Sequence, residues 1–306
     1  MLYVTTRNNT ETYTAWRAAS ESRGPDGGIY IPWKIVPFSR EELAPSRPIS
    51  ISESIALVVG RFLGIRIGDE RPVSLRLSSM GHRITVCEMG DLPYDVLFER
   101  VKSVMHIPLD LTTPWLEICV RIAVIFAVYR ELLQRGALDL GEQFDISVIS
   151  GGFYGPMSGW YAREMGIPVG NVICGCNENS CLWDLIYRGE LRTDRVCIDT
   201  LIPEADITVP DGLECLISNC CGIDEVKVYL EAVRTGKTYH AGAFYDTIRK
   251  GFHVSVVSKE AILRTIPNVF STSGILLPSG GALAYAGLLD YRARTGESKT
   301  SIVFTG

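Results

Sequence analysis

The sequence predicts an α/β fold built on a parallel sheet, because strand-like and helix-like segments alternate along most of the chain. Two runs carry this prediction. The apolar stretch at 144–150 ends in the glycine-rich SGGFYG and is followed by a helical pattern, and a second strand-like run, VGNVICGC, comes at 169–176. Loops at the carboxyl ends of parallel strands carry ligands, so the loop at Ser150 is the first place to look for a site.

Composition excludes several classes of protein. The chain has 306 residues, of which 46% are hydrophobic and 21% charged, so it is long and apolar enough for a large core or two lobes, and neither disordered nor fibrous. A net charge of −5 with scattered arginines predicts no basic face, and therefore neither nucleic acid nor an anionic membrane as partner.

Two further features bear on location. The start, MLYVTTRNNTETY, is polar, and nine cysteines are present, so we expect a reduced, cytoplasmic protein. The longest apolar stretch, from Trp115, carries Glu117, Arg121 and Arg130 at roughly helical spacing. Membrane spans rarely tolerate such charges, so this stretch predicts a buried helix.

The elements of the first half follow from local signals. Residues 24–32, GPDGGIYIP, predict a glycine-rich turn and a short strand closed by Pro32. A candidate capping Ser50, helical apolar spacing and a closing Gly64 predict a helix over 50–64. We then expect a strand in HRITVCEM (82–89), a helix in PYDVLFERVKSVM (93–105), a strand in HIPLDL (106–111) and a long helix over 115–135.

The second half repeats the alternation less cleanly. Strands are expected at 144–150 and 169–176, with a helix at 156–165 between them. Later segments with strand or helix character are ADITVP, LECLISNC, IDEVKVYLEAVRTG, FHVSVVS, KEAILRTI, GALAYAGLLDYRARTG and a final SIVF. We find no internal repeat and no long linker.

The stretch SGGFYG has the composition of a phosphate-binding loop. Glycines between a strand and a helix let backbone N–H groups point inward, and the helix dipole favours an anion. It is not a Walker loop, because no lysine follows it. Taken alone, such a stretch is more often a tight turn than a ligand site.

Several segments, in order, resemble threonine synthase, a fold-type II enzyme dependent on pyridoxal phosphate. The opening YVTTRN with GPDGGIYIP is similar to the family's first signature, and residues 147–182 are similar throughout to its phosphate-loop block, including Asn-Glu-Asn at 177–179. Weaker matches follow at ITVPDGLECLI, GILLPSGGALAYAGL and the terminal VFTG. The resemblance therefore covers most of the chain.

The resemblance implies a set of ligand-binding residues. Ser150, Gly151 and Phe153 match the family's phosphate loop, whereas Gly152 stands where asparagine is usual and Tyr154 where glycine is usual. Thr305 matches the residue near the pyridine nitrogen of the cofactor, but it lies one residue from the end and is expected to fray. The candidate ligand-binding set is therefore Ser150, Gly151, Gly152, Phe153, Tyr154, Gly155, Asn177, Asn179 and Thr305.

What the sequence lacks matters more for chemistry. Threonine synthase holds its cofactor as a Schiff base on a lysine in a His-Gly-Pro-Thr…Phe-Lys-Asp stretch. Residues 60–97 pass straight from the N-terminal region to a later family strand, so the block with that lysine is deleted. None of the seven lysines, Lys34, Lys102, Lys227, Lys237, Lys250, Lys259 and Lys299, lies in the family context.

A second departure concerns the substrate phosphate. DLTTPWLEI at 110–118 resembles a family segment whose asparagine and arginine serve that phosphate, and Pro114 and Glu117 stand in their places. A carboxylate repels phosphate where a guanidinium would bind it. We therefore expect pyridoxal phosphate to be retained poorly, if at all, and no internal aldimine to form.

Other chemistry finds little support in the sequence. Cys174, Cys176 and Cys181, and the pair Cys220 and Cys221, lack the spacing of a zinc site, so buried thiols are expected and no metal. Four scattered histidines show no catalytic pairing, and the cluster GKTYHAGAFYD is expected to be a surface loop. The catalytic residues therefore stay unknown.

The resemblance implies the fold of the large domain of the tryptophan synthase β-like, fold-type II enzymes, with a reduced small domain. We divide the chain into an N-terminal region, 1–75, a remnant of the small domain, 76–112, and the main α/β domain, 113–306. Loss of half of a two-lobed enzyme would expose apolar surface, which predicts a homodimer.

Three functions remain open. The first is a degenerate threonine synthase-like protein that keeps a pocket for a small anionic or phosphorylated, amino-acid-like ligand at residues 150–155, repurposed in amino-acid or specialised metabolism. The second is a non-catalytic subunit, or pseudoenzyme, that pairs with itself or a paralogue. The third is a pyridoxal phosphate-dependent lyase with a relocated lysine, for which Lys237 is the candidate because a glycine precedes it in a predicted loop.

Overall fold

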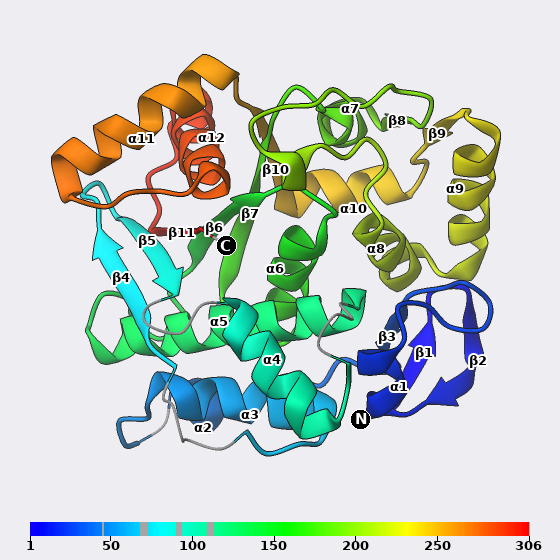
Figure 1. Cartoon of the computed structure of the whole chain (residues 1–306), viewed down its shortest axis with the longest axis horizontal. Coiled ribbons are helices and arrows are strands. Elements are labelled where there is room, and N and C mark those ends of the chain that lie inside the picture. Colours follow the sequence, from blue (N-terminus) through cyan, green and yellow to red (C-terminus); the bar gives the residue numbers. More distant parts are fainter. Residues whose placement is uncertain (45, 68–72, 90–93, 109–112, 306) are drawn as a thin grey trace. The chain divides into compact units, whose positions relative to one another are not determined.

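The computed structural model describes residues 1–44, 46–67, 73–89, 94–108 and 113–305 (Figure 1). The chain forms two compact units that interleave in sequence. Unit 1 comprises Met1–Arg76, Glu88–Glu142 and Ser158–Pro168, and unit 2 comprises Leu77–Cys87, Gln143–Met157 and Val169–Gly306. The domain boundaries that we predicted after residues 75 and 112 refer to the parts of a larger, two-lobed enzyme. They stay a prediction.

Unit 1 joins a small antiparallel sheet to a set of helices. The sheet has the order β2-β1-β3, formed by β1 (Tyr3–Thr5), β2 (Asn8–Tyr13) and β3 (Tyr30–Pro32). The helices are α1 (Ala15–Ser20), α2 (Arg40–Leu43), α3 (Ile51–Leu63), α4 (Tyr94–Met105) and α5 (Pro114–Gln134). Helix α3 packs along α5 (Figure 1).

The ends of α3 and α5 confirm the sequence signals. Ser50 accepts a hydrogen bond from the N–H of Glu53, whose carboxylate accepts one from the N–H of Ser50, and Gly64 closes α3 in the left-handed conformation. Thr113 caps α5, and Pro114 occupies its first turn, where a missing N–H costs nothing. Most of α5 is buried, as predicted for a helix that does not span a membrane.

Aromatic rings form the centre of the unit 1 core. The ring of Trp115 meets those of Tyr3, Phe62 and Tyr161 edge to face, with centroids 5.2–5.6 Å apart. The Tyr3 hydroxyl donates to the carbonyl of Phe62 over 2.7 Å, so the first strand is tied to the end of α3. Such ring pairs add to the stability gained from burial alone.

Unit 2 is built on a sheet with the order β10-β7-β6-β11-β5-β4. Its strands are β4 (Leu75–Ser79), β5 (Ile84–Met89), β6 (Phe144–Ile149), β7 (Val169–Cys176), β10 (Phe252–Val256) and β11 (Ser301–Phe304). From β10 to β5, every neighbouring pair is parallel, which confirms the predicted α/β class.

The remaining elements of this part of the chain are mostly helical. Helix α6 (Tyr154–Glu164) begins in unit 2 and ends in unit 1. Unit 2 further contains α7 (Cys181–Arg188), the 3-10 turn η1 (Pro203–Ala205), α8 (Gly212–Cys221), α9 (Ile223–Thr235), α10 (Phe244–Gly251), α11 (Lys259–Ser273), α12 (Ser279–Thr295) and the small pair β8 (Glu190–Arg192) and β9 (Thr238–His240).

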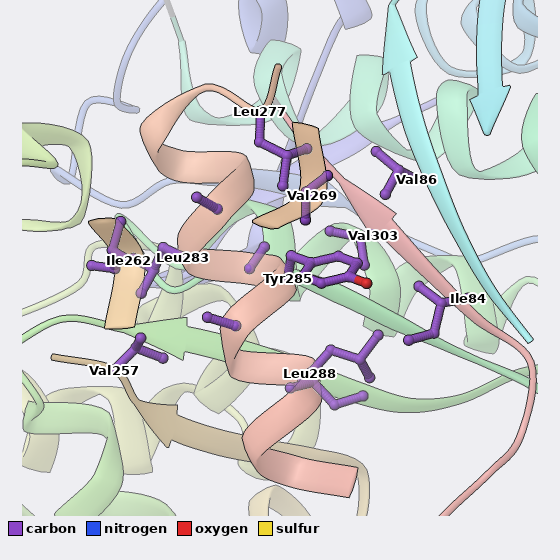
Figure 2. Close-up of a cluster of buried hydrophobic side chains, with 14 of the residues drawn as sticks. Ile84, Val86, Val257, Ile262, Val269, Leu277, Leu283, Tyr285, Leu288 and Val303 are labelled. Atoms are coloured by element: carbon purple, nitrogen blue, oxygen red, sulfur yellow. The ribbon is translucent and has the colours of Figure 1, made fainter. Parts of the chain in front are cut away.

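Helix α12 lies directly against the sheet. Figure 2 shows Tyr285 and Leu288 of α12 beside Val303 of β11 and Ile84 of β5, within one buried apolar cluster. The backbone of α12 comes very close to that of β7, because a Cβ on Gly175 would lie only 2.7 Å from the carbonyl oxygen of Leu283. Glycine at 175 therefore lets backbone meet backbone.

One predicted strand is wrong in the part that the structure describes. His106 adopts a left-handed conformation (φ 54), and the N–H of Ile107 donates to the carbonyl of Lys102 over 2.8 Å. This bond closes the last turn of α4, so residues 106–108 end a helix and form no strand. The rest of the predicted strand, 109–111, lies outside the described residues.

Two smaller findings complete the fold. Helix α6 begins two residues earlier than the predicted 156–165. Among the helices that the structure describes, none combines the length and apolar character that a membrane crossing requires.

Candidate functional site

The candidate residues lie at one edge of the unit 2 sheet. Strands β7, β6 and β11 are neighbours and run parallel, so their carboxyl ends share an edge. Residues 150–155 follow β6, Asn177 and Asn179 follow β7, and Thr305 follows β11. All nine candidate ligand-binding residues therefore follow three adjacent strand ends, the usual place for a ligand in a parallel sheet.

The loop after β6 has the shape of a tight turn at the start of a helix. Gly151 and Phe153 both have positive φ, 40° and 70°, and the N–H of Phe153 donates to the carbonyl of Ser150 over 2.8 Å. A phenylalanine in this conformation is strained by about 1 kcal/mol. Its ring is fully buried and packs 5.3 Å from that of Phe252, which holds the turn in place.

The two departures from the family pattern are coupled in space. A Cβ on Gly152 would lie 3.1 Å from Cε2 of Tyr154, closer than ordinary van der Waals contact. The Tyr154 ring therefore takes the room that a side chain at position 152 would need. On its other side Gly152 accepts a 2.8 Å hydrogen bond from the N–H of Gly212, the first residue of α8.

Asn177 and Asn179 use their side chains to hold the chain itself. Both amide groups donate to Oδ1 of Asp206, over 2.6 and 3.0 Å. Asn177 also donates to the Thr200 hydroxyl, and Asn179 exchanges two 2.8 Å hydrogen bonds with the backbone of Ile198. We name Asn177, Asn179, Thr200 and Asp206 the asparagine cluster; it fastens residues 198–206 to the end of β7.

Asp206 is the centre of this cluster, and sequence reasoning did not single it out. It lies in ADITVP, a segment expected to have strand or helix character, but the structure has neither strand nor α-helix over 206–210, and nothing in that run distinguishes an acceptor for two distant asparagines. Burial acts to raise the pKa of Asp206, but hydrogen bonds from Thr200, Asn177 and Asn179 outweigh it, so the pKa is lowered from its usual value. Asp206 is therefore held as a carboxylate.

Glu204 brings a negative charge to the same edge. Its carbonyl oxygen lies 3.0 Å from where a Cβ on Gly151 would be, and its carboxylate Oε1 lies 3.1 Å from the corresponding point on Gly280, at the start of α12. Glycine at both positions lets the turn η1 lie against them. The Glu204 carboxylate is exposed and opposes an anion at this edge.

Thr305 is held more firmly than expected. Its N–H and its hydroxyl both lie 3.3 Å from the carbonyl oxygen of Cys87, at the end of β5. The preceding strand β11 is buried between β6 and β5, so the expectation of fraying at Thr305 is wrong. A Cβ on Gly281 would lie 2.9 Å from the Cβ of Thr305, which places this threonine beside the first turn of α12.

Cys176, the last residue of β7, carries a thiol that is hydrogen-bonded with Ser150 of the loop. Burial raises its pKa to about 12, and a hydrogen bond with Ser150 offsets only part of that effect. Burial also raises the pKa of the Cys181 thiol to about 12. A thiol that stays protonated at neutral pH is a poor nucleophile, so neither cysteine suits covalent catalysis.

The lysines divide into exposed and buried. Lys34, Lys227, Lys237, Lys250 and Lys259 are exposed, and Lys299 is half-buried and paired with Glu297. Lys102, on α4 of unit 1, is the one lysine of the described chain that is buried. Sequence reasoning did not single out this burial, because it depends on how α4 packs in the fold.

Other predicted groups lie elsewhere. Glu117 is in the first turn of α5, in unit 1, where its carboxylate pairs with Arg121 over 3.0 Å. No group of three or more histidine, cysteine, aspartate or glutamate side chains suited to a metal ion occurs among the described residues. Tyr239 of the GKTYHAGAFYD cluster is buried and donates to Glu225 over 2.6 Å, so this stretch is partly structural.

Comparison with known proteins gives a consistent picture. No family model matches the chain. Threonine synthase-like 1 from Homo sapiens is 27% identical over 163 residues, which are 52% of this chain and 22% of that protein. Threonine synthase from Pseudomonas aeruginosa is 31% identical over 158 residues, which are 51% of this chain and 33% of that enzyme. The matched part thus spans a third or less of these relatives.

Solved structures extend the likeness to the whole fold. The pyridoxal phosphate-bound threonine synthase from Brucella melitensis superposes with a TM-score of 0.81 at 17% identity, over 100% of this chain and 88% of that one. Yeast threonine synthase gives 0.77 at 15% identity, over 99% and 86%. The chain is similar to threonine synthases in sequence over half its length, and it has their fold, that of the fold-type II enzymes.

Proposed function

We propose that this protein is a degenerate threonine synthase-like protein that binds a small anion, a phosphate or a phosphorylated amino-acid-like molecule, at residues 150–155 and performs no Schiff-base chemistry. The observation that carries the proposal is a contrast. A strand, a glycine turn and a helix of the kind that binds phosphate are present at a shared strand edge, whereas, by the resemblance, none of the seven lysines lies in the sequence context of the family's Schiff-base lysine.

The geometry of the loop supports an anion. Helix α6 runs for 11 residues from Tyr154, so its N-terminal dipole faces the turn that contains Gly151 and Gly152. Neither glycine carries a side chain that would obstruct backbone N–H groups. Phosphates commonly bind at this combination of turn and helix start.

The residues fit the phosphate of pyridoxal phosphate but not its covalent attachment. When bound, that cofactor supplies an electron sink for carbanions. Residues 150–155 would hold its phosphate, and Thr305 would meet its ring. A Schiff base needs a deprotonated amine over the reactive carbon, and Lys237, the candidate for a relocated lysine, is exposed to water on a loop.

The substrate side also departs from threonine synthase. Glu117 and Pro114 stand where the resemblance implies groups that hold the substrate phosphate. We therefore propose that phosphohomoserine, the substrate of threonine synthase, binds no better than inorganic phosphate.

A calorimetric titration with inorganic phosphate tests the proposal. We expect saturable binding that tightens about three- to tenfold in Glu204→Gln, because removal of a nearby, solvent-screened carboxylate is worth about 1 kcal/mol. Gly151→Val should abolish binding, since its side chain would meet the carbonyl of Glu204 in a left-handed backbone. Glu190→Gln, which removes an exposed carboxylate from β8, serves as the matched control and should bind like the wild type.

The position of Glu204 favours a second candidate, a non-catalytic subunit that pairs with itself or a paralogue. In this function the glycine loop is a structural remnant, and the carboxylate of Glu204 takes the place of an external anion. Failure of phosphate to bind either the wild type or Glu204→Gln would reject the first candidate and leave this one.

A further inference from the structure

A buried arginine in unit 1 has no role in the site described above. Arg130, on α5, is 1% exposed. Among the described residues, none accepts a hydrogen bond from its Nε, Nη1 or Nη2 atoms. A buried cation without hydrogen-bond partners is costly, and buried charges in proteins are normally paired.

Glu42 and Glu53, the two carboxylates whose charges act on Arg130, are occupied by other groups. Glu42 accepts from the N–H of Ser39 and pairs with Arg61. Glu53 accepts from the N–H of Ser50 and pairs with Arg47 over 3.1 Å. The guanidinium carbon of Arg130 lies 5.2 Å from the centre of the Phe126 ring, a contact that leaves all its N–H donors unused.

Arg130 lines two cavities, and their walls differ. One, of about 370 Å³, has four leucines, Leu43, Leu133, Leu138 and Leu140, and one carboxylate, Asp139, among its lining residues. The other, of about 510 Å³, contains Glu41, Glu42 and Arg47 among its lining residues. We name the first the leucine cavity; its volume falls within the range of small-molecule sites.

We propose that Arg130 and the leucine cavity bind a small aliphatic carboxylate, with the carboxylate on the guanidinium and the hydrocarbon chain against the leucines. A guanidinium presents a planar fork of donors that matches a carboxylate with two parallel hydrogen bonds. Such a ligand would satisfy the donors that the chain itself leaves without acceptors.

The walls favour a carboxylate with an apolar tail over a bare anion. Against four leucines, a hydrocarbon chain of several carbons is removed from water, which favours binding in proportion to the apolar area buried. Inorganic phosphate would gain nothing from them. The second cavity is less suitable for an anion, because two carboxylates, Glu41 and Glu42, line it, whereas the leucine cavity has one, Asp139, which is exposed and therefore screened by solvent.

This proposal is independent of the proposed function. The glycine loop belongs to unit 2, whereas Arg130 and every residue lining the leucine cavity belong to unit 1. Either site can therefore exist without the other.

Binding of sodium hexanoate to the full chain, followed by calorimetry or ligand-observed NMR, tests the inference. We expect saturable binding to the wild type and a loss of about tenfold or more in Arg130→Met, which keeps the length and apolar stem but removes the charge-assisted bonds. Arg130→Lys should also weaken binding, because an ammonium lacks the fork. Arg135→Met, at an exposed position directly after the end of α5, should bind like the wild type.

A second ligand keeps the test decisive if an Arg130 variant does not fold. Hexanol has the same chain without the charge, and we expect it to bind the wild type at least about tenfold more weakly than hexanoate. Equal binding of hexanol and hexanoate, undiminished hexanoate binding to folded Arg130→Met, or the lack of saturable hexanoate binding to the wild type would each overturn the inference.

Discussion

At the scale of single residues, the loop after β6 shows how two substitutions depend on each other. Gly152 and Tyr154 each differ from the residue that is usual in threonine synthases, and the tyrosine ring lies over the space above the glycine. Restoring the usual asparagine at 152 alone would press its Cβ against that ring. The change becomes tolerable once the ring is removed, which makes the pair a case for a double-mutant cycle.

We predict that Gly152→Asn lowers the free energy of unfolding by about 1–3 kcal/mol, the cost of overpacking. In a Tyr154→Gly background the same change should cost at least about 1 kcal/mol less. Urea unfolding of the four proteins measures both numbers. Gly236→Asn is the control, because that glycine caps α9 in the left-handed conformation with open space around it, and asparagine is tolerated there. A coupling energy near zero would refute the account of this pair.

At the scale of elements, the asparagine cluster joins the end of β7 to a segment more than 20 residues later in sequence order. Asp206 supplies the acceptors, and its pKa is lowered in the folded state because the hydrogen bonds that it accepts outweigh its burial. A lowered pKa means that this carboxylate stabilises the fold above its unfolded pKa of about 3.9, and that the contribution is lost as pH falls through the folded pKa.

Asp206→Asn should therefore lower the free energy of unfolding by about 1–3 kcal/mol at pH 7, since an amide cannot accept every bond that the carboxylate accepts. The difference from the wild type should shrink as the pH falls below about 4, where Asp206 itself becomes protonated. Urea unfolding over a series of pH values measures it. Asp246→Asn, an exposed carboxylate on α10, should show little change at pH 7, and a pH-independent deficit in Asp206→Asn would contradict the assignment.

Elements with local signals were predictable from sequence, and contacts between distant residues were not. Ser50, Glu53 and Gly64 mark the ends of α3 in the sequence itself, because a cap is a contact among near neighbours. The prediction of a strand is wrong at 106–108, because an apolar run carries no mark of the left-handed His106 that ends α4. The partners of Asn177 and the burial of Lys102 depend on the tertiary fold, so no local pattern could reveal them.

In the candidate site, too, the positions set by strand order were predictable from sequence, and the contacts between distant residues were not. The order of strands puts residues 150–155, Asn177 and Thr305 at one edge, as a parallel sheet predicts. The two asparagines hold residues 198–206 through Asp206, and their role as ligand contacts, which the resemblance implies, stays a prediction. Glu204 reaches this edge from a segment that the sequence alone could not place there.

At the scale of the whole molecule, we predict a homodimer. If the lysine block is deleted, as we propose, apolar surface that it covers in a two-lobed enzyme would need a partner, and closed two-fold assembly is the commonest solution. Light scattering at micromolar concentration should give twice the 33.8 kDa mass of the chain. A monomer at that concentration would count against both the dimer and the non-catalytic subunit that pairs with itself.

The central claim is that a threonine synthase fold persists here without its Schiff-base lysine, and borohydride trapping tests it most directly. The protein is incubated with pyridoxal phosphate, reduced, digested and mapped by mass spectrometry. We predict colourless protein before incubation and no lysine labelled in stoichiometric amount. Stoichiometric pyridoxyl on one lysine, whether the exposed Lys237 or the buried Lys102, would contradict the claim and show that the attachment point moved to another part of the chain.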